Sequence, residues 1–390
     1  MLTRWKVLTL PLKSILLTHF QDLTLTDFRN YPTLTLQLSS GINCFGGQNG
    51  SGKTNLLDAI HFLALTRGFR NSQDLNAVKE GETFFLTGAN FMGPDGKMLS
   101  VQCNVMKGRG KKLLINRQPL ERMSDHIGRI PLVSILPSDT ELIQGASAAR
   151  RRFIDLLISQ YDTAYLMGLI RYQRLLEQRN ALLRQFAESG RFDPLEIQIW
   201  DEQLLQTGIP LLEARIQFLK ELEPEFAAFF HEIVNERETP ALRYDTALGN
   251  NTPESWRERY ASTLDRDRRL GHTAGGIHRD DLSFFIDGRQ VRQFGSQGQQ
   301  KTFVIALKLA EYSLLARKKG QMPVLLLDDI FDKLDEHRLA AIAAILRDRI
   351  GGQVFVTDTS IERLRSIFPA AESRPVGLFE VRDAQVHPVT

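Results

Sequence analysis

The sequence predicts an α/β fold, a mixed sheet with flanking helices, into which a mainly helical lobe is inserted. A glycine-rich motif at 47–54 follows a short strand and opens a helix. A second apolar strand, which ends in two aspartates, lies far downstream. Between them, residues 148–235 show helical apolar spacing and few turn residues. We therefore expect a discontinuous α/β lobe, 1–147 plus 272–390, and an inserted helical lobe, 148–271.

The expected elements follow from the local patterns. Residues 33–38 alternate apolar and polar side chains, which is typical of a half-buried strand. The other strands expected in the first part of the chain are 42–45, 83–91, 99–106 and 112–116, with a helix at 54–65. Pro194 and Pro210 are expected to divide the helical region into several helices. Residues 239–275 are polar and are expected to be rich in loops, and the β/α pattern returns from about Gly276.

The composition is that of an ordinary globular protein. The 390 residues are 42% hydrophobic and 24% charged, with a net charge of +3. Cys44 and Cys103 form no C-x-x-C pair, which argues against a cysteine-rich zinc site or a disulfide framework and fits a reducing cytosol. No signal-peptide core is visible, and no stretch approaches the ~20 apolar residues of a membrane span. We expect a soluble, cytoplasmic protein without a membrane partner.

The motif at 47–54 fits the pattern G-x-x-x-x-G-K-[ST] and predicts a phosphate-binding loop. Its residues are Gly47, Gln48, Asn49, Gly50, Ser51, Gly52, Lys53 and Thr54. Glycines let backbone N–H groups turn inward around phosphates, and the helix N-terminus adds partial positive charge. We expect Lys53 to reach the β- and γ-phosphates of ATP and the Thr54 hydroxyl to hold Mg²⁺.

The strand at 324–327 predicts the acidic half of the same site. Four consecutive apolar residues suit a strand that is covered on both faces, and Asp328 and Asp329 follow at its carboxyl end. Asp328 is expected to bind Mg²⁺ and Asp329 to polarise the attacking water. From position 53 to position 328 the gap is 275 residues, so a whole subdomain lies between the two motifs. This spacing is typical of ATP-binding-cassette (ABC-type) heads.

A third motif precedes a helix expected at 301–317. Ser296, Gln297, Gly298, Gln299 and Gln300 resemble the ABC signature, which binds the γ-phosphate held by a second molecule. The alternative interpretation is that Ser296 only caps this helix. The position of the motif, shortly before Asp328, favours the signature.

Several segments, taken in order, resemble the RecF family, which belongs to the same broad group of ATPase heads as the SMC proteins. Besides the three motifs, the resemblance rests on residues 27–31 (DFRNY), 55–60 (NLLDAI), 136–139 (LPSD), 150–155 (RRRFID), 178–183 (QRNALL), 278–282 (HRDDL) and 334–335 (LD). The last pair matches the loop that spans the dimer interface, with Asp335 near the nucleotide.

Some positions depart from the family pattern. Residues 1–20 look like an extension or an upstream start, and Ile277 stands where a proline is expected. The second acid is Asp329 where most ABC heads use glutamate, and no switch histidine follows 353–357. The aspartate at position 329 and the missing switch histidine both suit a slow ATPase.

The resemblance implies a protein that dimerises on ATP and binds double-stranded and gapped DNA at junctions between single and double strands. It also implies work with RecR and RecO to load RecA. Arg150, Arg151 and Arg152 could contact DNA phosphates. Binding through phosphates would not depend on the DNA sequence. A second basic cluster spans 257–269. For both clusters a solvated helix face is the alternative. His278 is expected to position a loop rather than to bind a metal.

Other classes of ATPase fit the sequence less well. An ABC transporter subunit would need a membrane partner and is normally shorter. An SMC-like chromosome clamp needs far longer helices, because even 40 residues span only ~60 Å. An ATP-dependent nuclease of the overcoming-lysogenisation type needs a further carboxylate-rich domain. A binding scaffold with an inactive site stays open, because motifs do not reveal a rate.

Overall fold

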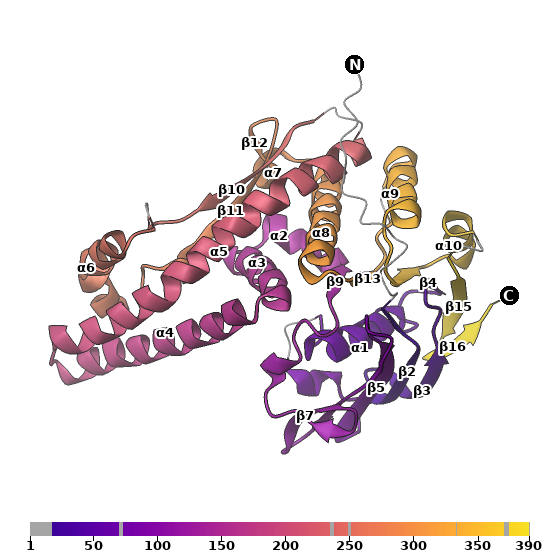
Figure 1. The fold of residues 1–390 in the computed structure, drawn as a ribbon, viewed down its shortest axis with the longest axis horizontal. Helices are drawn as coiled ribbons and strands as arrows, with labels where there is room; N and C mark the ends of the chain where they lie inside the picture. The colour runs from indigo at the N-terminus through magenta and orange to yellow at the C-terminus, as the bar shows by residue number, and fades with distance from the viewer. Residues whose placement is uncertain are drawn as a thin grey trace. The chain divides into compact units, whose positions relative to one another are not determined.

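The chain forms two compact units in the computed structural model, which describes residues 18–69, 73–234, 238–248, 251–332, 334–369 and 374–389. Unit 1 joins residues 1–137 to 312–390, and unit 2 is 138–311 (Figure 1). The predicted insertion, 148–271, lies inside unit 2, and its exact boundaries stay a prediction. Of the predicted N-terminal extension, residues 1–17 lie outside the described residues.

A six-stranded, mostly parallel sheet forms the centre of unit 1. Its order is β16-β15-β4-β14-β13-β9, and only β16 is antiparallel to its neighbour. The bounds are β4 (Ile42–Gly46), β9 (Leu132–Ile135), β13 (Val324–Leu327), β14 (Val354–Asp358), β15 (Val376–Arg382) and β16 (Gln385–Pro388). Every residue of β4, β13 and β14 is buried. The carboxyl ends of these three strands therefore meet at one edge of the sheet.

Unit 1 also contains an antiparallel sheet with the order β3-β2-β5-β6-β7-β8, and β1 pairs with β5. Its strands are β1 (His19–Phe20), β2 (Asp22–Phe28), β3 (Tyr31–Gln37), β5 (Phe84–Met92), β6 (Met98–Met106), β7 (Gly110–Ile115) and β8 (Gln118–Pro119). The strands predicted within 33–116 are confirmed. Helix α1 (Lys53–Leu65) contacts strands of both sheets. Phe28, Phe62 and Phe85 meet edge to face in this core, with ring centroids 5.1–5.8 Å apart.

The remaining elements of unit 1 are short. The 3-10 turns η1 (Asp74–Ala77) and η2 (Met123–Asp125) follow α1 and β8 in sequence. Helices α9 (Glu336–Asp348) and α10 (Ile361–Ile367) follow β13 and β14, so each lies between two strands of the parallel sheet in the chain. This β-α-β order is typical of parallel sheets.

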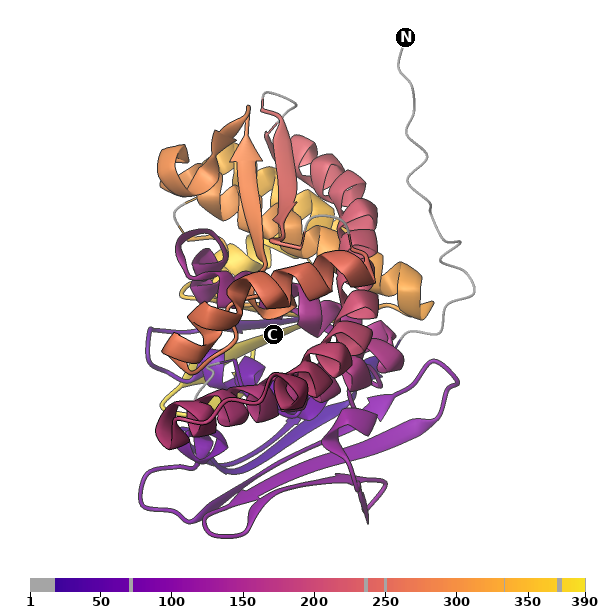
Figure 2. The same cartoon turned by 90° about the vertical axis from the view of Figure 1, so that its left-hand side faces the viewer.

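Unit 2 is mainly helical. The helices are α2 (Glu141–Gln144), α3 (Ser147–Tyr161), α4 (Thr163–Ser189), α5 (Pro194–Val234), α6 (Pro253–Leu270), α7 (Val291–Phe294) and α8 (Gln297–Lys319), which continues into unit 1. The 3-10 turns η3 (Pro137–Thr140) and η4 (Ile277–Arg279) and a small antiparallel sheet of β10 (Pro240–Asp245), β11 (Asp281–Ile286) and β12 (Arg289–Gln290) complete it. Helices α4 and α5 lie side by side, and α6 packs on both (Figures 1 and 2).

Two expectations for this region are wrong. Pro210 does not end a helix, because α5 runs on through both Pro210 and Pro224. Its long buried face against α4 outweighs the loss of single backbone hydrogen bonds. Residues 239–275 are not mainly loop, since they contain β10 and the 18-residue α6. Few residues of α6 are buried, and most of its positions are polar or charged. The apolar spacing that would predict a helix is therefore weak in the sequence.

Candidate nucleotide site

The predicted phosphate loop lies at the carboxyl end of β4 and leads into α1. The Gly47 N–H donates a hydrogen bond to the Asp358 carbonyl oxygen at 3.2 Å, which fixes the start of the loop to β14. The Lys53 ammonium is buried and donates to the carbonyl oxygens of Gly47 at 2.7 Å and Gln48 at 2.9 Å. The Lys53 ammonium therefore lies inside the loop that is expected to bind the phosphates.

Two of the glycines are required by space as well as by backbone conformation. Gly52 has a φ of 115°, and a Cβ atom there would lie 2.7 Å from the Tyr31 hydroxyl. A Cβ on Gly47 would lie 2.3 Å from the Val381 carbonyl oxygen. Neither neighbour is a movable side-chain end, since one is backbone and the other belongs to a fully buried tyrosine. The loop conformation thus depends on glycine at both positions.

The structure brings the predicted acidic strand to the same place. The Thr54 hydroxyl donates to both carboxylate oxygens of Asp328, at 2.9 and 3.0 Å, across 274 positions of sequence. The Thr357 hydroxyl, at the end of β14, donates to Asp328 at 2.7 Å and accepts the Asp329 N–H at 3.0 Å. One hydroxyl from α1 and one from β14 therefore orient the Asp328 carboxylate.

This donor set fits a magnesium ion that is shared with a nucleotide. Hydroxyl and carboxylate oxygens are hard ligands, and Mg²⁺ is commonly bound by one or two protein groups together with phosphates and water. Among the described residues, no group of three or more His, Cys, Asp or Glu could hold a metal ion alone. Thr54 and Asp328 are thus suited to a metal ion that arrives with its nucleotide.

Asp329 has the environment of a proton acceptor. It is partly buried and has a φ of 45°, a left-handed conformation that is uncommon for residues other than glycine. Burial raises the pKa of its carboxyl, and the negative charge of Asp328 raises it further, while Lys53 opposes the shift. Because the shift favours proton uptake, the carboxyl is a stronger base than an ordinary aspartate.

The turn between β2 and β3 supports the loop, a role that the sequence analysis did not predict. Tyr31 donates to the Gly52 carbonyl oxygen at 3.2 Å, and Asn30 donates to that of Ser51 at 3.4 Å. Asn30 also accepts from Asn55 at 2.8 Å. Arg29 forms two hydrogen bonds with Asp58 of α1, at 2.8 and 3.0 Å. Their side chains lie next to the loop only through tertiary contacts, so local patterns could not reveal this function.

A pocket of about 580 Å³ lies beside the loop in unit 1. Its walls are the loop, the start of α10 and the turn between β15 and β16, with lining residues Gly46 to Ser51, Thr359, Ile361, Glu362 and Glu380 to Asp383. The Ala384 N–H donates to the Ser51 carbonyl oxygen at 3.2 Å, which attaches this turn to the loop. The sequence indicated no role for this turn.

The signature segment begins helix α8 in unit 2. The Ser296 hydroxyl accepts the Gln299 N–H at 3.2 Å, and the Gln299 side chain accepts the Ser296 N–H at 2.9 Å. This reciprocal pair is a helix cap, which was the alternative interpretation. Ser296 and Gln297 are exposed, and Gly298 is half-buried. The cap and a signature role are compatible, because the exposed helix start still presents N–H groups. Asp335 is exposed too and caps α9 through the Arg338 N–H at 2.9 Å.

The structure does not support Arg150 as a DNA contact. Its guanidinium is buried and forms two bonds with Asp281, at 2.6 and 2.9 Å, and two more with the carbonyl oxygens of Leu142 and Gly145. Arg151 donates to the Asp280 carbonyl oxygen at 2.6 Å, whereas Arg152 is exposed. Because buried, paired donors cannot reach phosphate, only Arg152 stays a good candidate.

The second basic cluster and His278 have mainly structural contacts. Arg257 pairs with Glu202, and the Arg268 guanidinium lies 4.0 Å from the centre of the Phe192 ring. His278 contacts the Thr273 carbonyl oxygen and the Tyr172 hydroxyl, at 3.0 and 3.2 Å. Burial lowers the pKa of His278 to about 4, so the ring is neutral. These contacts agree with a loop-positioning role.

Comparison with known proteins places this geometry in a family. A family model described as the RecF/RecN/SMC N-terminal domain matches residues 19–385. The DNA replication and repair protein RecF of Flavobacterium johnsoniae is 42% identical over 349 residues, which cover 90% of this chain and 96% of that protein. The chain belongs to the RecF family. A second RecF, from Cytophaga hutchinsonii, is 38% identical and covers 94% of this chain and 96% of its own length.

Solved structures agree with this membership. A structure of the recombination mediator protein RecF with ATP superposes with a TM-score of 0.86 at 29% identity, over 96% of this chain and 99% of that one. The Smc head domain of Pyrococcus furiosus gives a TM-score of 0.58 at 15% identity, over 95% of this chain and 96% of that one. The RecF fold of this chain is thus an ABC-type ATPase head, with mixed sheets and a helical region. Within the described ranges, no helix has the length and apolar character needed to cross a membrane.

Proposed function

We propose that this chain is an ATP-dependent DNA-binding protein of DNA repair and recombination in the cytoplasm. It dimerises on ATP, binds double-stranded and gapped DNA at junctions between single and double strands, and helps RecR and RecO to load RecA. Its ATP hydrolysis is slow, is stimulated by DNA and serves as a switch. Family membership and the RecF relative solved with ATP support this proposal.

The observation that carries the proposal is the contact between Thr54 and Asp328. Two motifs that are far apart in sequence supply a hydroxyl and a carboxylate at 2.9 and 3.0 Å, beside the Lys53 ammonium. ATP binding would replace the bonds of Lys53 to loop carbonyls with bonds to the β- and γ-phosphates. Thr54 and Asp328 would hold Mg²⁺, which neutralises charge on the phosphates when it is bound.

Hydrolysis in this proposal depends on Asp329 and on a second copy of the chain. Asp329 accepts a hydrogen bond from the attacking water and draws off its proton. Ser296, Gln297, Gly298 and Gln299 of one copy contact the γ-phosphate held by the other, and Asp335 lies at the same interface. Each pocket is complete only in the dimer, so the bound nucleotide controls assembly.

Sedimentation with and without ATP tests the proposal. The wild type should change from monomer to dimer with ATP. The Lys53→Ala variant should neither bind ATP nor dimerise, because it lacks the positive charge that pairs with the phosphates. Lys112→Ala, an exposed lysine on β7, is the matched control. Ser296→Arg should bind ATP as a monomer but not dimerise, while Ser296→Asn keeps the helix cap. An ATP-bound dimer of Ser296→Arg would show that residues 296–300 only cap α8.

A further inference from the structure

A groove of about 660 Å³ opens between α4 and α5 in unit 2. It is lined by Asp162, Ala164, Tyr165, Met167, Gly168, Ile170, Arg171 and Arg174 from the α4 side and by Gln206, Thr207, Pro210, Leu211 and Ala214 from α5. All of these residues belong to one compact unit. Its volume is within the usual range of ligand pockets, roughly 300–1,000 Å³.

Two residues of unusual backbone chemistry shape the groove. Gly168 has no side chain, and a Cβ atom there would lie 3.4 Å from the Leu211 side chain, in ordinary van der Waals contact. Pro210 lies inside α5 and has no N–H, so the carbonyl of Gln206 lacks its regular helical donor. Gly168 and Pro210 both belong to the lining of the groove.

The floor of the groove is apolar and one wall is basic. Met167 is 41% exposed, which is high for a large apolar side chain, and Ile170 and Leu211 lie near it in the lining. Arg171 and Arg174 are exposed at the same wall. Asp162 also lines the groove, but its carboxylate accepts the Tyr165 N–H at 2.9 Å as the cap of α4. An apolar floor beside unneutralised positive charge is the complement of an acidic, amphipathic segment.

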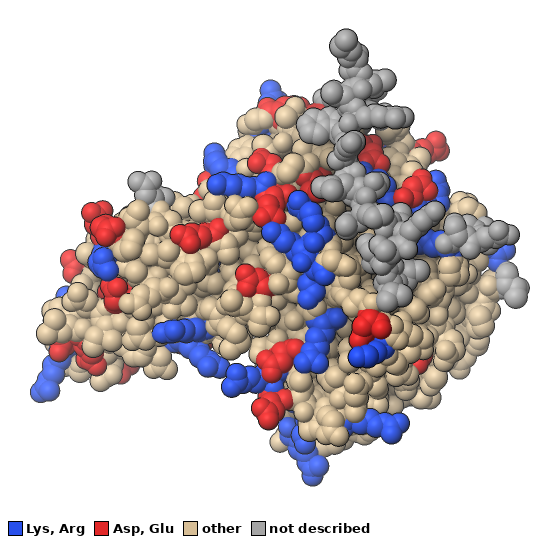
Figure 3. Space-filling view, in the orientation of Figure 1, with Lys and Arg blue, Asp and Glu red and all other residues tan. Residues whose placement is uncertain are grey.

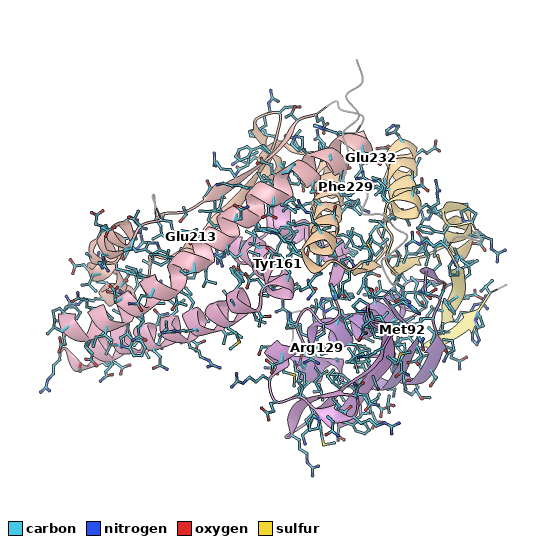
Figure 4. All side chains as sticks on the ribbon, viewed as in Figure 1. Met92, Arg129, Tyr161, Glu213, Phe229 and Glu232 are labelled. Atoms are coloured by element: carbon cyan, nitrogen blue, oxygen red, sulfur yellow. The ribbon has the colours of Figure 1, made fainter. Side chains whose placement is uncertain are left out.

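The guanidinium groups of both arginines are open to a partner, because the two residues are exposed. Neither Arg171 nor Arg174 has an ion pair within the described ranges, whereas Arg257 pairs with Glu202 and Arg382 with Glu380. Figure 3 shows basic side chains over the middle of α4. The exposed Glu177, three positions after Arg174 on α4, and the exposed Glu213, labelled on α5 in Figure 4, do not line the groove.

We propose that this α4–α5 groove docks an acidic, amphipathic segment of a partner protein. An apolar side chain of that segment packs beside Met167, and flanking carboxylates pair with Arg171 and Arg174. The apolar floor favours a peptide over DNA, because a phosphate backbone has no apolar group to bury there. None of the lining residues of this groove belongs to the nucleotide loop.

Fluorescence anisotropy on the full chain tests the site. The probe is a fluorescein-labelled helical peptide with leucines at positions i and i+4 and glutamates at the flanking positions. The double variant Arg171→Glu/Arg174→Glu should bind it about tenfold more weakly or worse, because two attractive pairs become repulsive. Ala164→Trp, which fills the groove without a change of charge, should weaken binding as well. Circular dichroism confirms that each variant is folded.

Arg184→Glu is the matched control, since Arg184 is an exposed arginine of α4 outside the groove. It should change peptide affinity by less than about twofold, the scale of an exposed charge without a partner. Equal losses in the control and the double variant would show nonspecific attraction and overturn the proposal. So would the absence of peptide binding by the wild type. A loss of duplex DNA affinity in the double variant, with peptide binding intact, would overturn it too and assign the arginines to DNA.

Discussion

Asp329 shows how a single residue is tuned by its surroundings. Its carboxyl lies next to that of Asp328, and its N–H is fixed by the Thr357 hydroxyl. Burial and the neighbouring negative charge both oppose ionisation of Asp329, so its pKa stands above the range of an ordinary aspartate. The two neighbouring acids thus have different surroundings, because the hydroxyls of Thr54 and Thr357 donate to the Asp328 carboxylate.

Asp329→Asn should bind ATP normally but hydrolyse it about a hundredfold more slowly, since it cannot accept a proton. The wild-type rate should fall as pH decreases through the raised pKa of Asp329, because the protonated carboxyl is inactive. Single-turnover rates against pH measure both effects. Asp348→Asn, an exposed acid of α9, should leave the profile unchanged. A wild-type rate in Asp329→Asn would exclude this residue as the base.

His126 makes stability depend on pH. Its ring is fully buried and its Nε2 lies 2.7 Å from the Leu63 carbonyl oxygen, and burial lowers its pKa from 6.5 to about 4. Between these pH values the unfolded chain binds a proton that the folded chain does not. The free energy of unfolding should therefore fall with pH below 6.5, by about 2 kcal/mol at pH 5.

Urea unfolding of the wild type and of His126→Gln at pH 7 and pH 5 measures this contribution. Other titratable groups also change the free energy of unfolding between pH 7 and pH 5, and they do so in both proteins. The difference between the two changes therefore isolates the contribution of His126. The variant should lose less stability than the wild type over the same interval. Equal losses in the two proteins would mean that His126 is not neutral in the folded chain.

Among the elements, the turn between β2 and β3 has the least obvious role. It extends from the antiparallel sheet to the first turn of α1, and its side chains meet the phosphate loop at Ser51 and Gly52. The side chains at both ends of the turn are anchored in the core, since Phe28 and Tyr31 are fully buried. We infer that this turn positions the loop before nucleotide arrives, which lowers the cost of ordering it.

Asn30→Ala should weaken ATP binding several-fold, because both the Ser51 and the Asn55 contacts are lost. Tyr31→Phe should have a smaller effect, since it removes one hydrogen bond and keeps the ring. Calorimetric titration with ATP measures the affinities. Thr33→Ala, at an exposed position of β3, is the control. Unchanged affinity in both turn variants would assign the turn to folding alone.

For the whole molecule, the proposed DNA binding requires a surface that attracts phosphate groups. The net charge of +3 is small, so attraction must come from local groups. Of the three arginines expected to contact DNA, Arg150 is buried, Arg151 is half-buried and Arg152 is exposed, so Arg152 is the best placed for a phosphate contact. A phosphate contact contributes the same to the binding affinity for every DNA sequence, and it weakens as the salt concentration rises.

Arg152→Ala should lower the affinity for gapped duplex DNA and reduce the slope of log affinity against log salt by about 1. Arg150→Ala should instead destabilise the fold by leaving Asp281 without its partner, and should not change the slope. Anisotropy at several salt concentrations with saturating ATP separates the two. A slope that is the same in Arg152→Ala and in the wild type would exclude Arg152 as a phosphate contact.

The sequence by itself determined the P-loop motif, the acidic strand, the strands within 33–116 and the family, because these depend on local spacing and residue type. Only the tertiary structure decided what distant residues do together. It joined Thr357 to Asp328, brought Asn30 to the phosphate loop and buried Arg150 against Asp281. It also carried α5 through Pro210, since packing along a whole helix outweighs one missing hydrogen bond. Such contacts depend on the summed packing of many residues, which no local pattern contains.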